Sequence, residues 1–315
     1  NTMDWLSADE QFLALSQRHY GHAQRLTADD GVPRLSLPSL NDAAGRARLV
    51  ELLVRHTFVV LENVGEGEAY WRALEASFHD FFVHGAADEK QACQGEVYFN
   101  ETGTPMWYSG FEALEGNDNV RETFRIHAAL VPETGADTGA GDGPPLRWPS
   151  EQFRLRWRAL HLFCQRIADL ALSITLDSLA VTVAGFTSGD ACRAEGTDHS
   201  VGYAWHYPNE EGGASTVPED IAGEAGINVK EHVDQSLFVI EPCPRVGGLE
   251  VFDLHTREWI QVESVLRHGE EWVLFGGRCL EKATGGTVPA CLHRVRAANA
   301  RRFCFISEQK YGEFY

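Results

Sequence analysis

The chain has 315 residues, 43% of them hydrophobic, which is enough to bury a substantial core. Its formal net charge of -19 repels phosphate backbones and anionic lipid surfaces, which disfavours nucleic acid and membranes as partners. The seven cysteines are odd in number and include no Cys-x-x-Cys pair, which argues against a disulfide framework and favours a cytoplasmic location.

The first two thirds of the sequence predict mainly helices, from the spacing of apolar residues. No stretch is expected to have the length and apolarity of a transmembrane helix, and the longest predicted helix is expected to pack on a sheet. The predicted elements are, in chain order, helix 1–30, extended 35–40, helix 43–56, strand 58–61, helix 68–82, surface loop 133–145 and helix 153–182.

After Gly202 the sequence changes to short apolar runs separated by Gly and Pro turns. Several short strands with turn signals between them predict a sandwich or a barrel. The predicted strands are 237–240, 249–252, 259–262, 272–275, 291–295 and 303–306.

The most informative motif is His232-x-Asp234, which is followed 61 residues later by His293. Two imidazoles and one carboxylate can hold one face of a metal and leave the opposite face open. Ferrous iron needs that open face if it is to bind O2 and an organic acid together. Zinc accepts the same donors, and an isolated His-x-Asp pair is often only a polar strand end.

Arg302 follows His293 by nine residues and favours iron over zinc. A guanidinium forms a planar fork that suits a carboxylate, and zinc hydrolases do not need such a group beside the metal. The combination therefore predicts a metal site that works with an acidic co-substrate.

At these residues the chain resembles the 2-oxoglutarate- and iron-dependent dioxygenases of the isopenicillin N synthase-like family. The resemblance covers roughly residues 35 to 310 and implies a mainly β fold with flanking helices around a double-stranded β-helix (jelly roll) core. It is carried, in the family's order, by His56–Leu61, Phe81-Phe82 before Glu89-Lys90, Asn119–Phe124, Tyr203–Pro208, Gly248–Val251 and Trp259–Val262.

The resemblance also implies how the chain is organised. Residues 1–200 are expected to form an N-terminal helical and mixed region that packs on the core. Residues 201–315 are expected to form the main part of the double-stranded β-helix, with the iron and 2-oxoglutarate sites. The two parts are expected to be one structural unit.

The resemblance implies Fe(II) as cofactor, with 2-oxoglutarate and O2 as co-substrates. It assigns metal binding and catalysis to His232, Asp234 and His293. A metal held in this way would support hydroxylation, desaturation or oxidative cyclisation of a small molecule, in specialised metabolism.

For the far carboxylate of 2-oxoglutarate the resemblance implies Arg302, with Tyr207 and Cys304 beside it. The family usually has Arg-x-Ser after the second His, and Cys304 takes the place of that Ser. Arg301 is adjacent and is the alternative anchor.

The substrate is expected to be a small, carboxylate-bearing metabolite. The Gly-rich stretch 209–231 is expected to act as a lid, because it immediately precedes the metal ligands. Arg125 and Arg278 are further cations for an acidic substrate. The candidate substrate-binding residues are Tyr108, Phe111, Arg121 and Arg296.

Two other functions remain open at the level of the sequence. One is an iron oxidase that works without 2-oxoglutarate, of the isopenicillin N synthase or amino-acid oxidase type. The other is a non-catalytic jelly-roll module that binds a metal.

Overall fold

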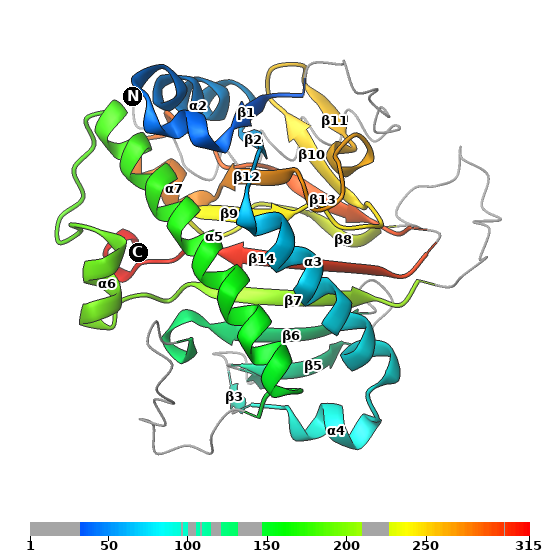
Figure 1. Cartoon of the computed structure of the whole chain (residues 1–315). Coiled ribbons are helices and arrows are strands. Elements are labelled where there is room, and N and C mark those ends of the chain that lie inside the picture. The colour runs from blue at the N-terminus through cyan, green and yellow to red at the C-terminus, as the bar shows by residue number, and fades with distance from the viewer. Residues whose placement is uncertain are drawn as a thin grey trace.

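The structure is a computed structural model, and it describes residues 32–95, 97–99, 105–107, 109–114, 121–131, 147–209, 227–298 and 300–315. A layer of helices covers one face of a large sheet, and a smaller sheet packs on the other face (Figure 1). Alternate side chains of a strand point to opposite faces. Val59 and Leu61 accordingly pack with the helices, while Phe58 and Val60 pack between the sheets.

The large sheet has eight strands, and only its first pair, β1 and β2, is parallel. Strands from the start, middle and end of the chain lie side by side in it, so the N-terminal half is part of the same sheet as the C-terminal half. The order is β1 (Arg34–Ser36), β2 (Phe58–Glu62), β12 (Trp272–Gly276), β9 (Phe238–Pro242), β14 (Arg302–Glu308), β7 (Val201–Tyr207), β6 (Arg121–His127) and β5 (Gly110–Leu114).

The small sheet is antiparallel, in the order β11 (Glu258–Ile260), β10 (Leu249–Asp253), β13 (His293–Arg296) and β8 (Ile227–His232). From β7 to β14 the chain passes back and forth between the two sheets, with only β10 and β11 consecutive in one sheet. The inward side chains of both sheets therefore form a common interior. A separate hairpin pairs β3 (Val97–Phe99) with β4 (Pro105–Trp107).

Two of the helices that cover the large sheet, α2 and α5, begin at residues whose side chains cap them. Asp42 accepts a hydrogen bond from the Gly45 N–H at 2.7 Å, and Ser150 accepts one from the Phe153 N–H at 3.0 Å. The helices are α2 (Ala43–His56), α3 (Glu66–Phe78) with a π-helical turn (His79–His84), α4 (Ala87–Ala92), α5 (Glu151–Ser178), α6 (Gly189–Glu195) and α7 (Arg278–Ala283), with short 3-10 helices at Leu37–Asn41, Ala128–Leu130, Val262–Ser264 and Gly312–Phe314.

Most elements predicted from the sequence are confirmed. The predicted helix 43–56 is α2, the helix 153–182 is α5 with its end at Ser178, and the C-terminal apolar runs fall on β9 to β14. The predicted extended segment 35–40 is wrong from Leu37 onward, where a 3-10 helix begins with proline in its first turn. The predicted helix 1–30 and loop 133–145 lie outside the described residues.

The prediction that no stretch reaches the length and apolarity of a transmembrane helix is wrong. Among the described residues, α5 is long and apolar enough to cross a membrane by length and composition. However, 61% of its most apolar 18-residue window is buried inside the protein. Its apolar side packs against α3 and the large sheet, as expected of a core helix.

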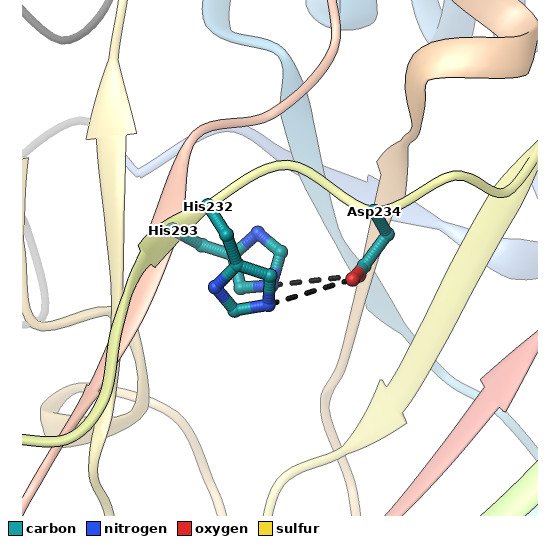
Figure 2. Close-up of side chains that lie close together, drawn as sticks. All are labelled: His232, Asp234 and His293. Atoms are coloured by element: carbon teal, nitrogen blue, oxygen red, sulfur yellow. Dashed lines mark ion pairs between the residues drawn. The ribbon is translucent and has the colours of Figure 1, made fainter. Parts of the chain in front are cut away.

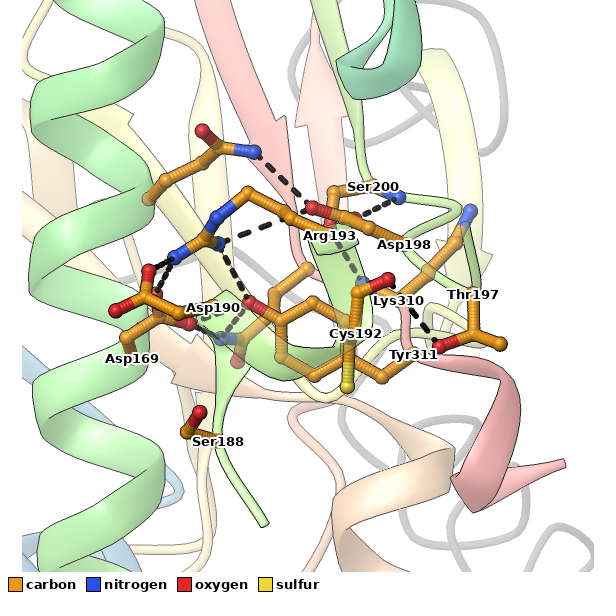
Figure 3. Close-up of polar contacts among 12 residues, drawn as sticks. Asp169, Ser188, Asp190, Cys192, Arg193, Thr197, Asp198, Ser200, Lys310 and Tyr311 are labelled. Atoms are coloured by element: carbon orange, nitrogen blue, oxygen red, sulfur yellow. Dashed lines mark hydrogen bonds and ion pairs between the residues drawn. The ribbon is translucent and has the colours of Figure 1, made fainter. Parts of the chain in front are cut away.

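A polar cluster ties the end of the chain to α5 and so fixes β14, the strand that carries Arg302 (Figure 3). Arg193 of α6 lies 2.8 Å from an oxygen of Asp169 on α5 and donates to the Tyr311 hydroxyl at 3.2 Å. Gln309, the next residue after β14, donates to Asp169 at 2.9 Å.

Candidate metal centre and co-substrate pocket

His232, Asp234 and His293 lie together at one end of the small sheet (Figure 2). His232 ends β8 and is the register partner of His293, which begins β13. Asp234 follows β8, and its backbone carbonyl accepts a hydrogen bond from the Arg278 N–H at 2.7 Å. One donor atom from each of the three side chains lies within 4.8 Å of the others. The structure therefore brings together three side chains that the sequence singled out.

Both imidazole rings direct their Nε2 atom at the Asp234 carboxylate, because Nδ1 is held elsewhere. The Nδ1 of His232 is 2.8 Å from the Lys230 carbonyl oxygen, and the Nδ1 of His293 is 3.1 Å from that of Cys291. Because a carbonyl oxygen can only accept, each Nδ1 must carry a proton, and each neutral ring then has its lone pair on Nε2.

The two Nε2 atoms lie 3.5 Å (His232) and 3.4 Å (His293) from the carboxylate oxygens of Asp234. Lone pairs that face a carboxylate at this distance repel it unless a proton or a metal cation lies between them. Figure 2 shows both rings directed at the carboxylate. The donor set therefore fits a metal ion held on one face by two nitrogens and one oxygen.

The protonation states of the three side chains also agree with a metal site. Burial lowers the pKa of His293 to about 4, so its ring is neutral at pH 7. Burial alone would raise the pKa of Asp234, but His293 and His232 outweigh this effect and lower it to about 2. Burial also acts to lower the pKa of His232, but the hydrogen bond to Asp234 and its charge outweigh burial and raise it. The site thus offers one neutral imidazole, one carboxylate anion and one imidazole whose proton a metal ion would replace.

Arg302, Tyr207 and Cys304 lie together in the interior between the two sheets, and all three are fully buried. Tyr207 is the register partner of Arg302, whose guanidinium lies 5.6 Å from the centre of the tyrosine ring and 2.9 Å from the Cys304 sulfur. The Arg302 Nε and the Tyr207 hydroxyl are buried with no hydrogen-bond partner in the part of the chain that the structure describes.

Two glutamates that the sequence analysis missed also hold Arg302. Its Nη2 lies 2.8 Å from an oxygen of Glu241, on β9, and 2.9 Å from an oxygen of Glu263, in the 3-10 helix after β11. Gly248 leaves room for this cluster, because a Cβ there would lie only 3.1 Å from the Arg302 Nε. The predicted anchor for a co-substrate carboxylate is therefore already paired with two carboxylates of the protein.

Arg301, the alternative anchor, lies apart from this interior cluster. It lines a cavity of about 540 Å³ together with Arg72, Arg245 and Phe303. Because neighbouring residues of an extended chain point in opposite directions, Arg302 faces the interior while Arg301 faces this cavity beside α3.

The four predicted substrate residues do not form one group. Tyr108 and most of the 209–231 stretch lie outside the described residues. Phe111 packs with Phe81 and Phe124 on the helix-facing side of the large sheet. The Arg296 side chain lies 2.8 Å from Glu250.

Arg121 lies on the interior side instead. Its guanidinium lies 4.3 Å from the centre of the Trp205 ring, a cation–π contact on the face that also carries Tyr207. Of the described candidates, Arg121 is thus the one placed in the interior between the sheets.

Arg125, which the sequence analysis gave only as a further cation, is better placed than Arg121 to bind an acidic substrate. It is the register partner of Tyr203, and its Nε and Nη2 are buried with no hydrogen-bond partner among the described residues. Burial raises the pKa of the Tyr203 hydroxyl, and the charges of Glu308, Arg125 and Asp234 all act on that hydroxyl. Arg125 therefore lies on the side of the sheet that faces the candidate metal site.

No family model and no curated protein sequence matches the chain, but solved structures do. A dioxygenase for auxin oxidation from rice is 19% identical, over 89% of this chain and 83% of that one, with a TM-score of 0.62. A 2OG-Fe(II) oxygenase family protein from Caulobacter crescentus is 18% identical, over 89% and 87%, with a TM-score of 0.62.

A Neurospora crassa protein solved in complex with alpha-KG and thymine is 13% identical, over 91% of this chain and 88% of that one, with a TM-score of 0.66. Identities this low establish similarity of fold. The chain therefore has the fold of the 2-oxoglutarate- and iron-dependent oxygenases.

Proposed function

We propose that the chain is an Fe(II)- and 2-oxoglutarate-dependent oxygenase that acts on a small, carboxylate-bearing metabolite. The observation that carries this proposal is the convergence of two imidazole lone pairs and one carboxylate at the end of the small sheet. The back-and-forth path of β7 to β14 between two sheets supports a double-stranded β-helix core. The similarity to solved oxygenases of this class agrees with both.

His232, Asp234 and His293 are the residues that would hold iron. The carbonyls of Lys230 and Cys291 fix the two imidazole rings in the tautomer that ligates through Nε2. When iron is bound, the chemistry it supplies is oxidation of a substrate by O2, coupled to decarboxylation of 2-oxoglutarate to succinate and CO2. The protein orients the reactants and excludes water around them.

Arg302 and Tyr207 are the residues that would hold the far carboxylate of 2-oxoglutarate. In support, each has a buried donor with no partner among the described residues, namely the guanidinium Nε and the phenol hydroxyl. Cys304 lies beside them and accepts a hydrogen bond from Arg302 at 2.9 Å, so it helps to orient the guanidinium.

A second candidate is an iron oxidase that works without 2-oxoglutarate. The specific observation in its favour is the pairing of Arg302 with Glu241 and Glu263, which gives the guanidinium carboxylate partners from the protein itself. Substrate oxidation that proceeds at the same rate without 2-oxoglutarate would favour this candidate.

Arg125 is the residue that would bind the acidic group of the substrate. A hydrogen bond to a charged group contributes about 1.5–3 kcal/mol, so Arg125→Gln should raise the KM for substrate roughly 10- to 100-fold. The apparent KM for 2-oxoglutarate and the iron affinity should change little. The measurement is steady-state kinetics with each of the two reactants varied in turn.

Arg296→Gln is the matched control, because Arg296 is paired with Glu250. It should leave both KM values close to those of the native protein. If Arg296→Gln raises the substrate KM and Arg125→Gln does not, the substrate carboxylate binds elsewhere.

The proposal is tested by a screen of small molecules in which succinate formation is measured with Fe(II), 2-oxoglutarate and O2. Auxin and thymine are the first probes, because solved structures with this fold include a dioxygenase for auxin oxidation and a protein in complex with thymine. Small carboxylic acids form the rest of the screen. Turnover of a protein, a nucleic acid or a neutral lipid, with none of any small carboxylate, would contradict the proposal.

The proposal extends to the setting of the protein. We expect one structural unit, because β1, β2, β5 and β6 share a sheet with the C-terminal strands. We also propose a cytoplasmic location and a role in specialised metabolism. The net charge of -19 supports a small-molecule partner rather than nucleic acid or a membrane.

A further inference from the structure

The cluster around Arg302 has an unusual balance of charge. One guanidinium, fully buried, lies between two carboxylates whose side chains are 4% (Glu241) and 1% (Glu263) exposed. If both glutamates are ionised, the cluster carries a net negative charge in the buried interior. A co-substrate carboxylate that binds Arg302 would add a second uncompensated negative charge, which a buried site strongly disfavours.

The two glutamates differ in how well their ionised forms are stabilised. Glu263 accepts hydrogen bonds from the N–H groups of Gly248 at 2.6 Å and Leu249 at 2.8 Å, in addition to its contact with Arg302. Within the described part of the chain, the Glu241 carboxylate contacts only side chains, those of Arg302 and Cys304. Backbone N–H donors favour a carboxylate anion, so Glu241 is the member of the pair that takes up a proton.

The charged and titratable groups that face Glu241 from the described residues are compatible with this assignment. Arg302 and Cys304 face it from β14, Glu263 from the 3-10 helix after β11, Tyr207 from β7, and Cys243 follows β9 itself. Burial and the charge of Glu263 together raise the pKa of Glu241 to about 8, against the opposing effect of Arg302. The proton therefore binds and leaves in a pH range that is accessible to experiment.

We propose that Glu241 and Glu263 hold Arg302 when no co-substrate is present, and that an anionic co-substrate binds Arg302 only together with a proton on Glu241. The two glutamates would then set the affinity for 2-oxoglutarate and make it depend on pH. This inference rests on the proposed function, because it takes 2-oxoglutarate to be the ligand of Arg302.

The direction of the pH dependence follows from the charges. A bound carboxylate raises the pKa of Glu241 further, so the complex holds a proton that the free protein loses above about pH 8. Between these two pKa values the affinity for 2-oxoglutarate should fall about tenfold for each pH unit, with uptake of about one proton per 2-oxoglutarate bound. Below the lower pKa, Glu241 is already protonated and the affinity should be constant.

The experiment is calorimetry of 2-oxoglutarate binding to the Fe(II)-loaded protein without O2, from pH 7 to 9. Each pH is measured in two buffers of different ionisation enthalpy, which gives the number of protons taken up. Glu241→Gln imitates the protonated side chain, so it should bind 2-oxoglutarate more tightly than the native protein at pH 9 and without proton uptake. Glu250→Gln is the matched control, because Glu250 is equally buried but pairs with Arg294, and it should behave like the native protein.

The outcomes separate this inference from the proposed function. Binding to the native protein with constant affinity and no proton uptake from pH 7 to 9 would overturn the inference and leave the function standing. A lack of 2-oxoglutarate binding to both the native protein and Glu241→Gln at every pH would overturn both. If Glu241→Gln does not fold, the pH series on the native protein alone decides.

Discussion

Replacing His293 by alanine is expected to abolish O2-dependent turnover and Fe(II) binding while the protein remains folded. His293 provides one of three donor atoms, and two remaining ligands do not define one face of a metal. The ring also packs against Phe275, with 4.8 Å between ring centres, so some stability is lost. The measurements are anaerobic iron titration, substrate turnover and circular dichroism.

His206→Ala is the matched control for this prediction. His206 is as buried as His293, with 5% exposure for both, but its Nδ1 lies 2.7 Å from Glu122, away from the metal site. It should lose stability and keep its iron. Substantial turnover by His293→Ala without an added rescue ligand would remove His293 from the site.

Replacing Arg302 by methionine is expected to lower the free energy of unfolding by about 3–5 kcal/mol, because the buried Glu263 carboxylate, and Glu241 where it is ionised, lose their cation. Part of this loss should return when Glu241→Gln is added, since glutamine is neutral without having to take up a proton. In the variant the folded state disfavours an ionised carboxylate in this cluster, so it holds protons that the unfolded chain loses. The loss of unfolding free energy caused by Arg302→Met should therefore be small at low pH. It should grow as the pH rises through the range in which the glutamates of the folded variant lose their protons.

Urea unfolding of the native and variant proteins at pH 5 and pH 8 measures this effect. Arg294→Met is the control, because its partner Glu250 keeps a contact with Arg296 after the substitution. A loss below about 1 kcal/mol for Arg302→Met at pH 8 would mean that the cluster is not charged as described.

The candidate metal site could be predicted from the sequence because its residues carry a local signal. His232 and Asp234 are two residues apart in the sequence. The residues around His293 and Arg302 are apolar, or alternate between apolar and polar, as residues of strands do. The order of the motifs along the chain, which is that of the family, then indicated that these residues form one site. The apolar runs at β9, β10 and β12 were equally clear, because these strands are buried on both faces.

The cluster around Arg302 could not be found in this way. Glu241 and Glu263 are 61 and 39 residues from Arg302 in the sequence. The pairing of β9 with β14 in the large sheet brings Glu241 to Arg302, and the packing of the small sheet brings Glu263. One signal was present: Glu241 follows the apolar run Phe238–Ile240 within a strand, where a carboxylate is buried at a cost unless it is paired. β6 was missed for a related reason, because its charged residues, Arg121 and Arg125 among them, conceal a strand whose other face is buried.

The measurement that tests the central claim most directly is conversion of 2-oxoglutarate to succinate by the purified protein with Fe(II) and O2. We predict succinate formation that requires both iron and O2, rises when a substrate is present and disappears in His293→Ala. A native protein that binds iron and oxidises a substrate equally fast without 2-oxoglutarate, or that forms no succinate with any substrate, would contradict the account.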